Sequence, residues 1–314
     1  MRSAQGLFFS VYTMVEVKEF PVHEEYKKGT ATSDDVAKLR SWLKTQPHLP
    51  EEFITDLDIA LAYHSCNKSM EVTKQGLDLN FSLRTLFTAY FKDRKFDRTM
   101  ERTFENTLFV PLPHQTQDGN VVLYSQVLNS DPNEFNVENN IRALLMCIDL
   151  WQYETGSWSG LEVVLNFKGY GIGHMPKIDI RNVQQILHYL QEAIPLKLKK
   201  LHLVNAPSFF DRLLSIMRPF INNEILNIVE VYSDGFKNIV KNIPLEVFPK
   251  DVGGHYKTVK ELNDEVIKKL HSSSSFFEAE NKKRVVESLR PGKPKNYSNM
   301  FGGVEGSFKK LDID

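Results

Sequence analysis

The residues of this chain that could take part in catalysis do not form an active-site pattern. His64 and Cys66 lie two positions apart, but the pair lacks a third group to orient the histidine and a donor for an oxyanion. The run GYGIG at 169–173 lacks the third glycine of a dinucleotide-binding turn and continues into Met175 and Pro176 rather than into a helix start. The sequence also contains no GxSxG, HExxH or phosphate-binding-loop motif. We therefore predict that the protein is not an enzyme.

The histidines and cysteines also give no metal-binding pattern. His174, His188 and His202 do not share one face of a predicted element, as the ligands of one ion would. Cys66 and Cys147 are the two cysteines of the chain, too few for a disulfide framework or a thiolate-rich site, and this number fits a reducing compartment. We predict free thiols, structural histidines, no metal and no cofactor.

Composition predicts a soluble globular protein. Of the 314 residues, 41% are hydrophobic and 25% are charged, so the chain can bury a large core. The 39 basic and 40 acidic residues leave a net charge of -1, which argues against a nucleic-acid partner. No stretch approaches the roughly 20 apolar residues that span a bilayer, and the early run GLFFSVYTM is a poor signal peptide because no small-residue cleavage site follows it. We expect a cytoplasmic protein.

The first elements along the chain are predicted to be helices. Apolar residues recur at helical spacing in SDDVAKLRSWLKTQP, EEFITDLDIALAYH and MEVTKQGLDLNFSLRTLFTAYF, and Ser33 and Asp34 are expected to cap the first helix. The charged run KDRKFDR at 92–98 is expected to be a solvated turn. The first third of the chain is therefore predicted to be a packed group of helices.

From about residue 107, strands alternate with helices. NVVLYSQVL (120–128), LEVVLNF (161–167) and KKLHLVNAP (199–207) read as strands, with helices at 139–154 and 179–195 between them. This order predicts an α/β fold with a mostly parallel sheet. The tail beyond residue 255 is expected to contain one helix, interrupted by serines. A segment without a regular spacing of apolar residues is expected to follow it.

The stretch LHLVNAPSFFDRLLSIMRPFI (201–221) carries an unusual number of large apolar side chains. Phe209, Phe210, Leu213, Leu214 and Met217 form one broad helical stripe, and Pro219 ends it. This stripe fits an ordinary core helix, or a lid that covers a ligand cavity and can be released to a membrane.

The same stretch, followed by IPLEVFPKDVGG (243–254), resembles the CRAL-TRIO lipid-binding family. The similarity extends back through LEVVLNFKGYGIGHM and HSCNKSMEVTKQGLDLNFSLRTLF, and MFGGVEGSFKKLDID is similar to the end of insect members related to the tocopherol and retinaldehyde carriers. The resemblance implies an N-terminal extension (1–29), a helical domain (30–106), a lipid-binding domain (107–256) and a C-terminal helix and tail (257–314). It also implies a sheet that floors an apolar cavity, closed by a mobile gate that begins near residues 206–207.

The resemblance assigns the cavity to matching positions on the strands, the following helix and the gate. The sheet and helix positions are Tyr124, Leu165, Phe167, Tyr170, Ile172, His174, Ile186, Tyr189, Leu190, Ile194, Leu201 and Leu203. The gate positions are Phe209, Phe210, Leu213, Leu214, Met217, Phe220 and Ile221. The polar groups of Tyr124, Ser125, Tyr170, His174 and Tyr189 would orient the head of the ligand.

A basic cluster for an anionic membrane or phosphoinositide is only partly present. Lys197 and Lys199 match family positions, Lys200 adds a charge, and Arg212 and Arg218 belong to the gate. In contrast, His64 and Cys66 stand where arginines are usual, Glu224 and Ile228 occupy basic gate-end positions, and Asn166 replaces an acidic residue. These departures weaken the implied coupling to phosphoinositides.

The leading hypothesis is a monomeric carrier that binds one tocopherol-, retinoid-, carotenoid- or sterol-like molecule and exchanges it at membranes by opening the gate. Its partners would be the hydrophobic ligand and, transiently, a membrane surface. The alternative hypothesis is a lipid-responsive sensor or scaffold, in which the position of the lid controls a contact with a protein partner.

Overall fold

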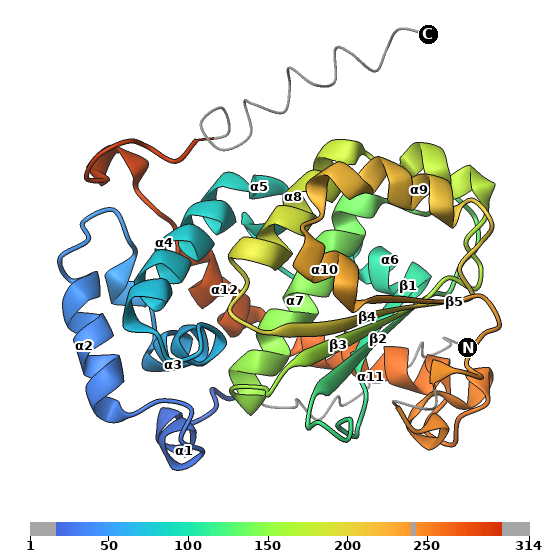
Figure 1. Cartoon of the computed structure of the whole chain (residues 1–314), viewed down its shortest axis with the longest axis horizontal. Helices are drawn as coiled ribbons and strands as arrows, with labels where there is room; N and C mark the ends of the chain where they lie inside the picture. Colours follow the sequence, from blue (N-terminus) through green and yellow to red (C-terminus); the bar gives the residue numbers. More distant parts are fainter. Residues whose placement is uncertain (1–16, 240–242, 297–314) are drawn as a thin grey trace, which may run out of the picture.

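The computed structural model describes residues 17–239 and 243–296, and Figure 1 shows a helical half beside a half built around a sheet. The helical half contains α1 (Val22–Lys27), α2 (Ser33–Leu43), η1 (Glu51–Phe53), α3 (Asp56–Ser65), α4 (Met70–Leu86) and α5 (Thr88–Phe91), and α6 (Arg98–Asn106) leads from it into the half built around the sheet. Helix α2 begins after Thr32, whose hydroxyl accepts from the amide of Asp35 in a capping box, so the cap lies one position before the predicted Ser33. Thr55 caps α3 in the same way.

The sheet has five strands in sequential order. They are β1 (Thr107–Pro111), β2 (Val121–Val127), β3 (Leu161–Asn166), β4 (Leu198–Val204) and β5 (Val229–Tyr232). Strand β1 is antiparallel to β2, and the other neighbours are parallel. The predicted fold, a mostly parallel α/β sheet preceded by helices, is confirmed.

Helices connect the parallel strands. The connections contain α7 (Val137–Thr155), η2 (Ile172–Lys177), α8 (Ile180–Glu192), α9 (Phe210–Met217), η3 (Arg218–Phe220) and α10 (Asn223–Ile228). We call residues 206–228, which contain α9, η3 and α10, the gate segment. Figure 1 shows α8, α9 and α10 on one side of the sheet and α11 on the other.

The strand pairing assigns side chains to the two faces. Leu165 lies opposite Ser125 and Leu203, so these three point to the same side. This side, which also carries Val163 and Leu201, is the gate face. Tyr124, Val164 and His202 are paired with one another and define the far face.

The C-terminal region forms two helices rather than one. It contains η5 (Leu245–Val247), η6 (Lys250–Val252), α11 (Val259–His271), α12 (Ser274–Lys282) and η7 (Glu287–Leu289). The serine run separates α11 from α12, and Ser273 is fully buried at the junction. Residues 297–314, which include the end that resembles insect members, lie outside the described residues.

The charged run at 92–98 is a solvated turn except at Arg94. Lys92 and Asp93 form a turn and are exposed, as are Lys95 and Arg98. Asp97 caps α6 by accepting from the amides of Thr99 and Met100. Arg94 is 1% exposed and forms an ion pair with Asp149. The burial of Arg94 was not predicted, because the carboxylates that compensate it come from distant parts of the chain.

Candidate functional site

An aromatic cluster joins the loop after β3 to the first turn of the gate segment. The ring centroid of Phe167 lies 5.1 Å from that of Tyr170 and 5.3 Å from that of Phe210, the first residue of α9. His174 lies 5.1 Å from the Tyr170 ring and 5.4 Å from the ring of Phe135. Separations of about 4.5–7 Å are those of favourable aromatic pairs. The structure therefore brings four of the predicted site residues together at the base of α9.

His174 has a buried ring nitrogen without a partner. Its Nδ1 lies 3.1 Å from the amide nitrogen of Gly171 and 3.2 Å from the carbonyl oxygen of the same residue, so Nδ1 either accepts from the amide or donates to the carbonyl. Nε2 is buried and has no hydrogen-bond partner among the described residues, and the side chain is only 1% exposed. A buried polar atom without a partner costs about 1–3 kcal/mol, so a polar group of a ligand would stabilise the cluster.

Many apolar side chains predicted to line the cavity are only half-buried. On the gate face and on α8, this is true of Leu165, Leu201, Ile186 and Leu190. In the gate segment it holds for Phe209, Leu213, Leu214, Met217 and Phe220, whereas Phe210 and Ile221 are buried. Leu203 is buried on the gate face, and so is Ser125. Apolar residues on the sheet, on α8 and in the gate segment thus retain accessible surface.

A glutamine of α8 holds the C-terminal part of the gate segment. The side chain of Gln191 donates from Nε2 to the carbonyl oxygen of Phe220 at 3.0 Å. Its Oε1 accepts from the amide of Asn222 at 2.7 Å. Sequence reasoning missed this residue, because an isolated glutamine on an amphipathic helix carries no local signal of a backbone partner about 30 residues away.

Three predicted cavity residues point elsewhere. Tyr124 lies on the far face, where its hydroxyl donates to Gln126 and accepts from Asn166. The hydroxyl of Tyr189 accepts from Asn80 and Arg84 of α4, so this side chain faces the helical half. Ile172 is 69% exposed. We correct these three assignments.

Asn166 stands at a strand position where an acidic residue was expected. Its side chain amide is part of a hydrogen-bond network that a carboxylate could not complete. Its Oδ1 accepts from the side chain of Asn205 at 2.8 Å, while its Nδ2 donates to Tyr124 at 2.9 Å. A carboxylate could accept from Asn205 but could not donate to Tyr124.

Comparison with known proteins assigns the family. The pattern described as "CRAL/TRIO domain" matches residues 105–254, and the pattern described as "Pinta-like, UBA domain" matches residues 28–100. Residues 105–254 therefore form a CRAL-TRIO domain. A human relative, "Alpha-tocopherol transfer protein-like", is 23% identical over 234 residues, which are 74% of this chain and 62% of the relative. The chain therefore spans less than two thirds of that relative's length.

Two further similarities are to a yeast protein and to a solved structure. "SEC14 cytosolic factor" from Kluyveromyces lactis is 27% identical over 119 residues, or 33% of this chain and 40% of the yeast protein. The crystal structure of Sfh5 aligns with a TM-score of 0.48 at 14% identity, over 74% of this chain and 92% of that one.

Three lysines gather around the start of β4, and we call Lys68, Lys197 and Lys199 the basic strip. Burial lowers the pKa of Lys197, and the neighbouring charges of Lys199 and Lys68 lower it further, so the three cations lie close together. Burial also lowers the pKa of His64, whose Nε2 lies 3.0 Å from the carbonyl oxygen of Trp158. Neutral His64 adds no charge to the strip.

Apart from Arg218, the remaining positions of the predicted basic site carry little positive charge. Lys200 is compensated by an ion pair of 3.1 Å with Glu230. Glu224 is exposed and Ile228 is half-buried on α10, and Cys66 is half-buried at the end of α3. Arg218 is exposed at the start of η3.

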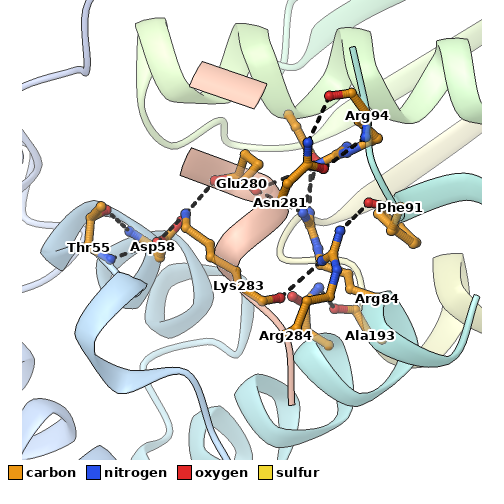
Figure 2. Close-up of polar contacts among 12 residues, drawn as sticks. Thr55, Asp58, Arg84, Phe91, Arg94, Ala193, Glu280, Asn281, Lys283 and Arg284 are labelled. Carbon is orange, nitrogen blue, oxygen red and sulfur yellow. Dashed lines mark hydrogen bonds and ion pairs between the residues drawn. The ribbon is translucent and has the colours of Figure 1, made fainter. Parts of the chain in front are cut away.

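A buried network of charges joins the helical half to the CRAL-TRIO domain, and sequence reasoning missed it. Arg84 of α4 pairs with Asp149 of α7 at 2.7 Å and with Glu280 of α12 at 3.1 Å. Arg94 pairs with the same two carboxylates at 2.7 and 3.5 Å. Figure 2 shows Glu280 beside Arg84 and Arg94, with Lys283, the residue after α12, extending toward Asp58. Because its members come from four separate regions, no local pattern predicts it.

A small cavity of about 90 Å³ lies beside this network. Its walls include Asn80, Arg84, Gln152, Ile194 and Lys283. Drug-sized ligands occupy pockets of about 300 Å³ or more, whereas a water molecule takes about 30 Å³. Ile194 therefore borders a space that suits a few water molecules and not a lipid.

Other classes of site are not found in the part of the chain that the structure describes. Within residues 17–239 and 243–296, no helix is long and apolar enough to cross a membrane. The same residues contain no group of three or more His, Cys, Asp or Glu side chains that could hold a metal ion.

Proposed function

We propose that this protein is a lipid carrier that holds one hydrophobic small molecule between the gate face and the gate segment and exchanges it at membranes. The observation that carries the proposal is the set of half-buried apolar side chains on the sheet, α8 and the gate segment of a CRAL-TRIO domain. Side chains such as Leu165, Leu190 and Met217 would complete their burial against a ligand. The family and the name of the human relative support transfer rather than catalysis.

The energetics suit reversible carriage. A ligand that buries roughly 400 Å² of apolar surface gains on the order of 10 kcal/mol at about 25 cal/mol per Å², before the costs of association. Such a gain keeps a lipid out of water during transfer. A membrane that offers an apolar environment at the opened gate segment would let the lipid leave without exposure to water.

The buried Nε2 of His174 supports a ligand with one polar end. We propose that Nε2 carries the ring proton and donates it to a hydroxyl, carbonyl or ester oxygen when the ligand is present, and that Ser125 offers a second polar contact on the gate face. A tocopherol-, retinoid-, carotenoid- or sterol-like molecule with a single polar end fits this chemistry. The aromatic rings of Phe167 and Tyr170 would pack against its ring or chain.

Exposed apolar residues beside the gate segment support a membrane contact. Ile172 is 69% exposed between two exposed glycines, and Ile216 on α9 is 45% exposed. Lys168, Lys177 and Arg212 are exposed near them in the sequence. We propose that these apolar side chains insert at the interface while the cations attract anionic headgroups.

The proposal includes the organisation expected from the sequence. We assign residues 1–29 to an extension, 30–106 to a helical domain, 107–256 to the lipid-binding domain and 257–314 to a C-terminal region that contains α11 and α12. We further propose a monomer that acts in the cytoplasm and binds membranes transiently.

Extraction of the protein purified from its native source tests the proposal directly. Mass spectrometry of the solvent extract should find one hydrophobic species at close to one molecule per protein. The loaded protein should then accelerate movement of that species between phosphatidylcholine vesicles. Binding without accelerated transfer would favour the sensor or scaffold, and absence of both binding and transfer would overturn the proposal.

A further inference from the structure

The C-terminal end of the gate segment is fastened by one side chain of α8. Gln191 lies within hydrogen-bond distance of two backbone groups that flank Ile221, donating to the carbonyl oxygen of Phe220 and accepting from the amide of Asn222. It also donates to the carbonyl oxygen of Leu187 in its own helix, at 2.9 Å. Both ends of the amide are therefore used, which fixes its orientation.

The charged side chains of the gate segment add no comparable restraint. Asp211, Arg212, Arg218 and Glu224 are all exposed, and none forms an ion pair with another described residue. Helix α9 and η3 contact α8, and α10 contacts β4, so packing holds the rest of the segment. Much of this packing involves half-buried apolar side chains, which a membrane could also accommodate.

The bond to Asn222 lies where the gate segment changes direction. Residues 218–220 form η3, Ile221 is extended, and Asn222 caps α10 by accepting from the amide of Ile225 at 2.8 Å. An extended residue between two short helices can absorb a change in φ and ψ, as hinge residues do. Gln191 thus restrains the position at which α9 and η3 could rotate relative to α10.

We propose that Gln191 is the latch of the gate segment: its amide holds the backbone on either side of Ile221 and so sets how often the segment opens. The inference rests on the proposed carrier function for its biological meaning, but the latch itself is a property of the fold. Opening breaks two neutral hydrogen bonds, and water replaces them on both partners. The latch is therefore reversible and insensitive to salt, because neither partner is charged.

Amide hydrogen exchange of the full chain tests the latch. Gln191→Leu keeps a side chain of similar size and removes both bonds, so amides of the gate segment, Asn222 above all, should exchange about tenfold faster, which corresponds to about 1.4 kcal/mol. Gln191→Glu keeps the acceptor for Asn222 but places a carboxylate against the Phe220 carbonyl, and its effect should be intermediate. Gln185→Leu, a half-buried glutamine of the same helix, is the matched control and should exchange like the wild type.

The outcomes separate a latch from a structural role and from the carrier function. Faster exchange confined to residues 206–228 supports the latch. Unchanged exchange there in Gln191→Leu, or equal acceleration in α8 and the strands, overturns it. Transfer of a fluorescent tocopherol analogue between vesicles is measured in parallel: a wild type that transfers none of it would count against the carrier, while the exchange result would still decide the latch.

Discussion

At the scale of single residues, the buried Nε2 of His174 has no hydrogen-bond partner among the described residues. His174→Phe removes this buried nitrogen and keeps a ring in the aromatic cluster, so the free energy of unfolding of the ligand-free protein should rise by about 1 kcal/mol. The variant should bind a tocopherol analogue about tenfold more weakly, because it loses one hydrogen bond. Thermal unfolding and fluorescence titration measure the two effects.

The exposed His114 supplies the control for this substitution. His114→Phe should leave both stability and affinity unchanged. A His174→Phe variant that is less stable and binds as tightly as the wild type would contradict the role assigned to Nε2.

The direction of a side chain can be predicted from the sequence where one local rule decides it. Alternation along a strand places Leu201 and Leu203 together, and it needs no knowledge of the neighbouring strands. It does not say which of Tyr124 and Ser125 faces the gate segment, because that depends on the register between β2 and β3. Tyr189 was misassigned for a related reason: its partner Arg84 is 105 residues away in the sequence.

At the scale of elements, α9 and the loop around η2 form the surface that we expect to contact membranes. Ile172→Asp together with Ile216→Asp places two carboxylates on exposed positions, so the melting temperature should be unchanged. Transfer between vesicles should fall at least severalfold, because charged groups do not enter the apolar part of the interface. The control is Val72→Asp, at a position 50% exposed on α4, which should transfer normally.

Phe210 is unsuitable for this test because it is 5% exposed within the aromatic cluster. A carboxylate at that position would be buried beside Phe167, and the resulting loss of stability would obscure any effect on membranes. Comparable loss of transfer in Val72→Asp and in the Ile172 and Ile216 double variant would refute a localised membrane surface.

The basic strip at the start of β4 makes a separate electrostatic prediction. Lys197→Glu with Lys199→Glu should slow transfer to vesicles containing phosphatidylserine more than transfer to pure phosphatidylcholine vesicles. Added salt should reduce the difference between the two lipids. Lys44→Glu, in an exposed position of the helical half, serves as the control, and equal slowing on both kinds of vesicle would remove the electrostatic role.

At the scale of the whole molecule, the buried charges between the two halves make stability depend on pH. Burial alone would raise the pKa of Asp149, but Arg84 and Arg94 outweigh it and hold the pKa below its ordinary value. Such a carboxylate stabilises the fold above the pKa of the unfolded chain, about 3.9. This contribution is lost as the pH falls toward the lower pKa of the folded state.

Asp149→Asn should therefore lower the free energy of unfolding at pH 7 by about 3–5 kcal/mol, since it leaves buried guanidinium groups poorly compensated. Below pH 4, the free energy of unfolding of the variant should fall less steeply with decreasing pH than that of the wild type. Urea unfolding between pH 2 and 7 measures both quantities. Asp118→Asn, at an exposed position, is the control, and an unchanged acid slope in Asp149→Asn would disprove this account.

The order in which the ribosome makes this chain gives the charge network a further consequence. Glu280 follows Arg84 by 196 residues, and at about 5–20 residues per second it emerges roughly 10–40 s later. Asp149 follows Arg84 by only 65 residues, so for most of this interval Arg84 and Arg94 have Asp149 without Glu280. The charges between the two halves are therefore fully compensated only once α12 has been made.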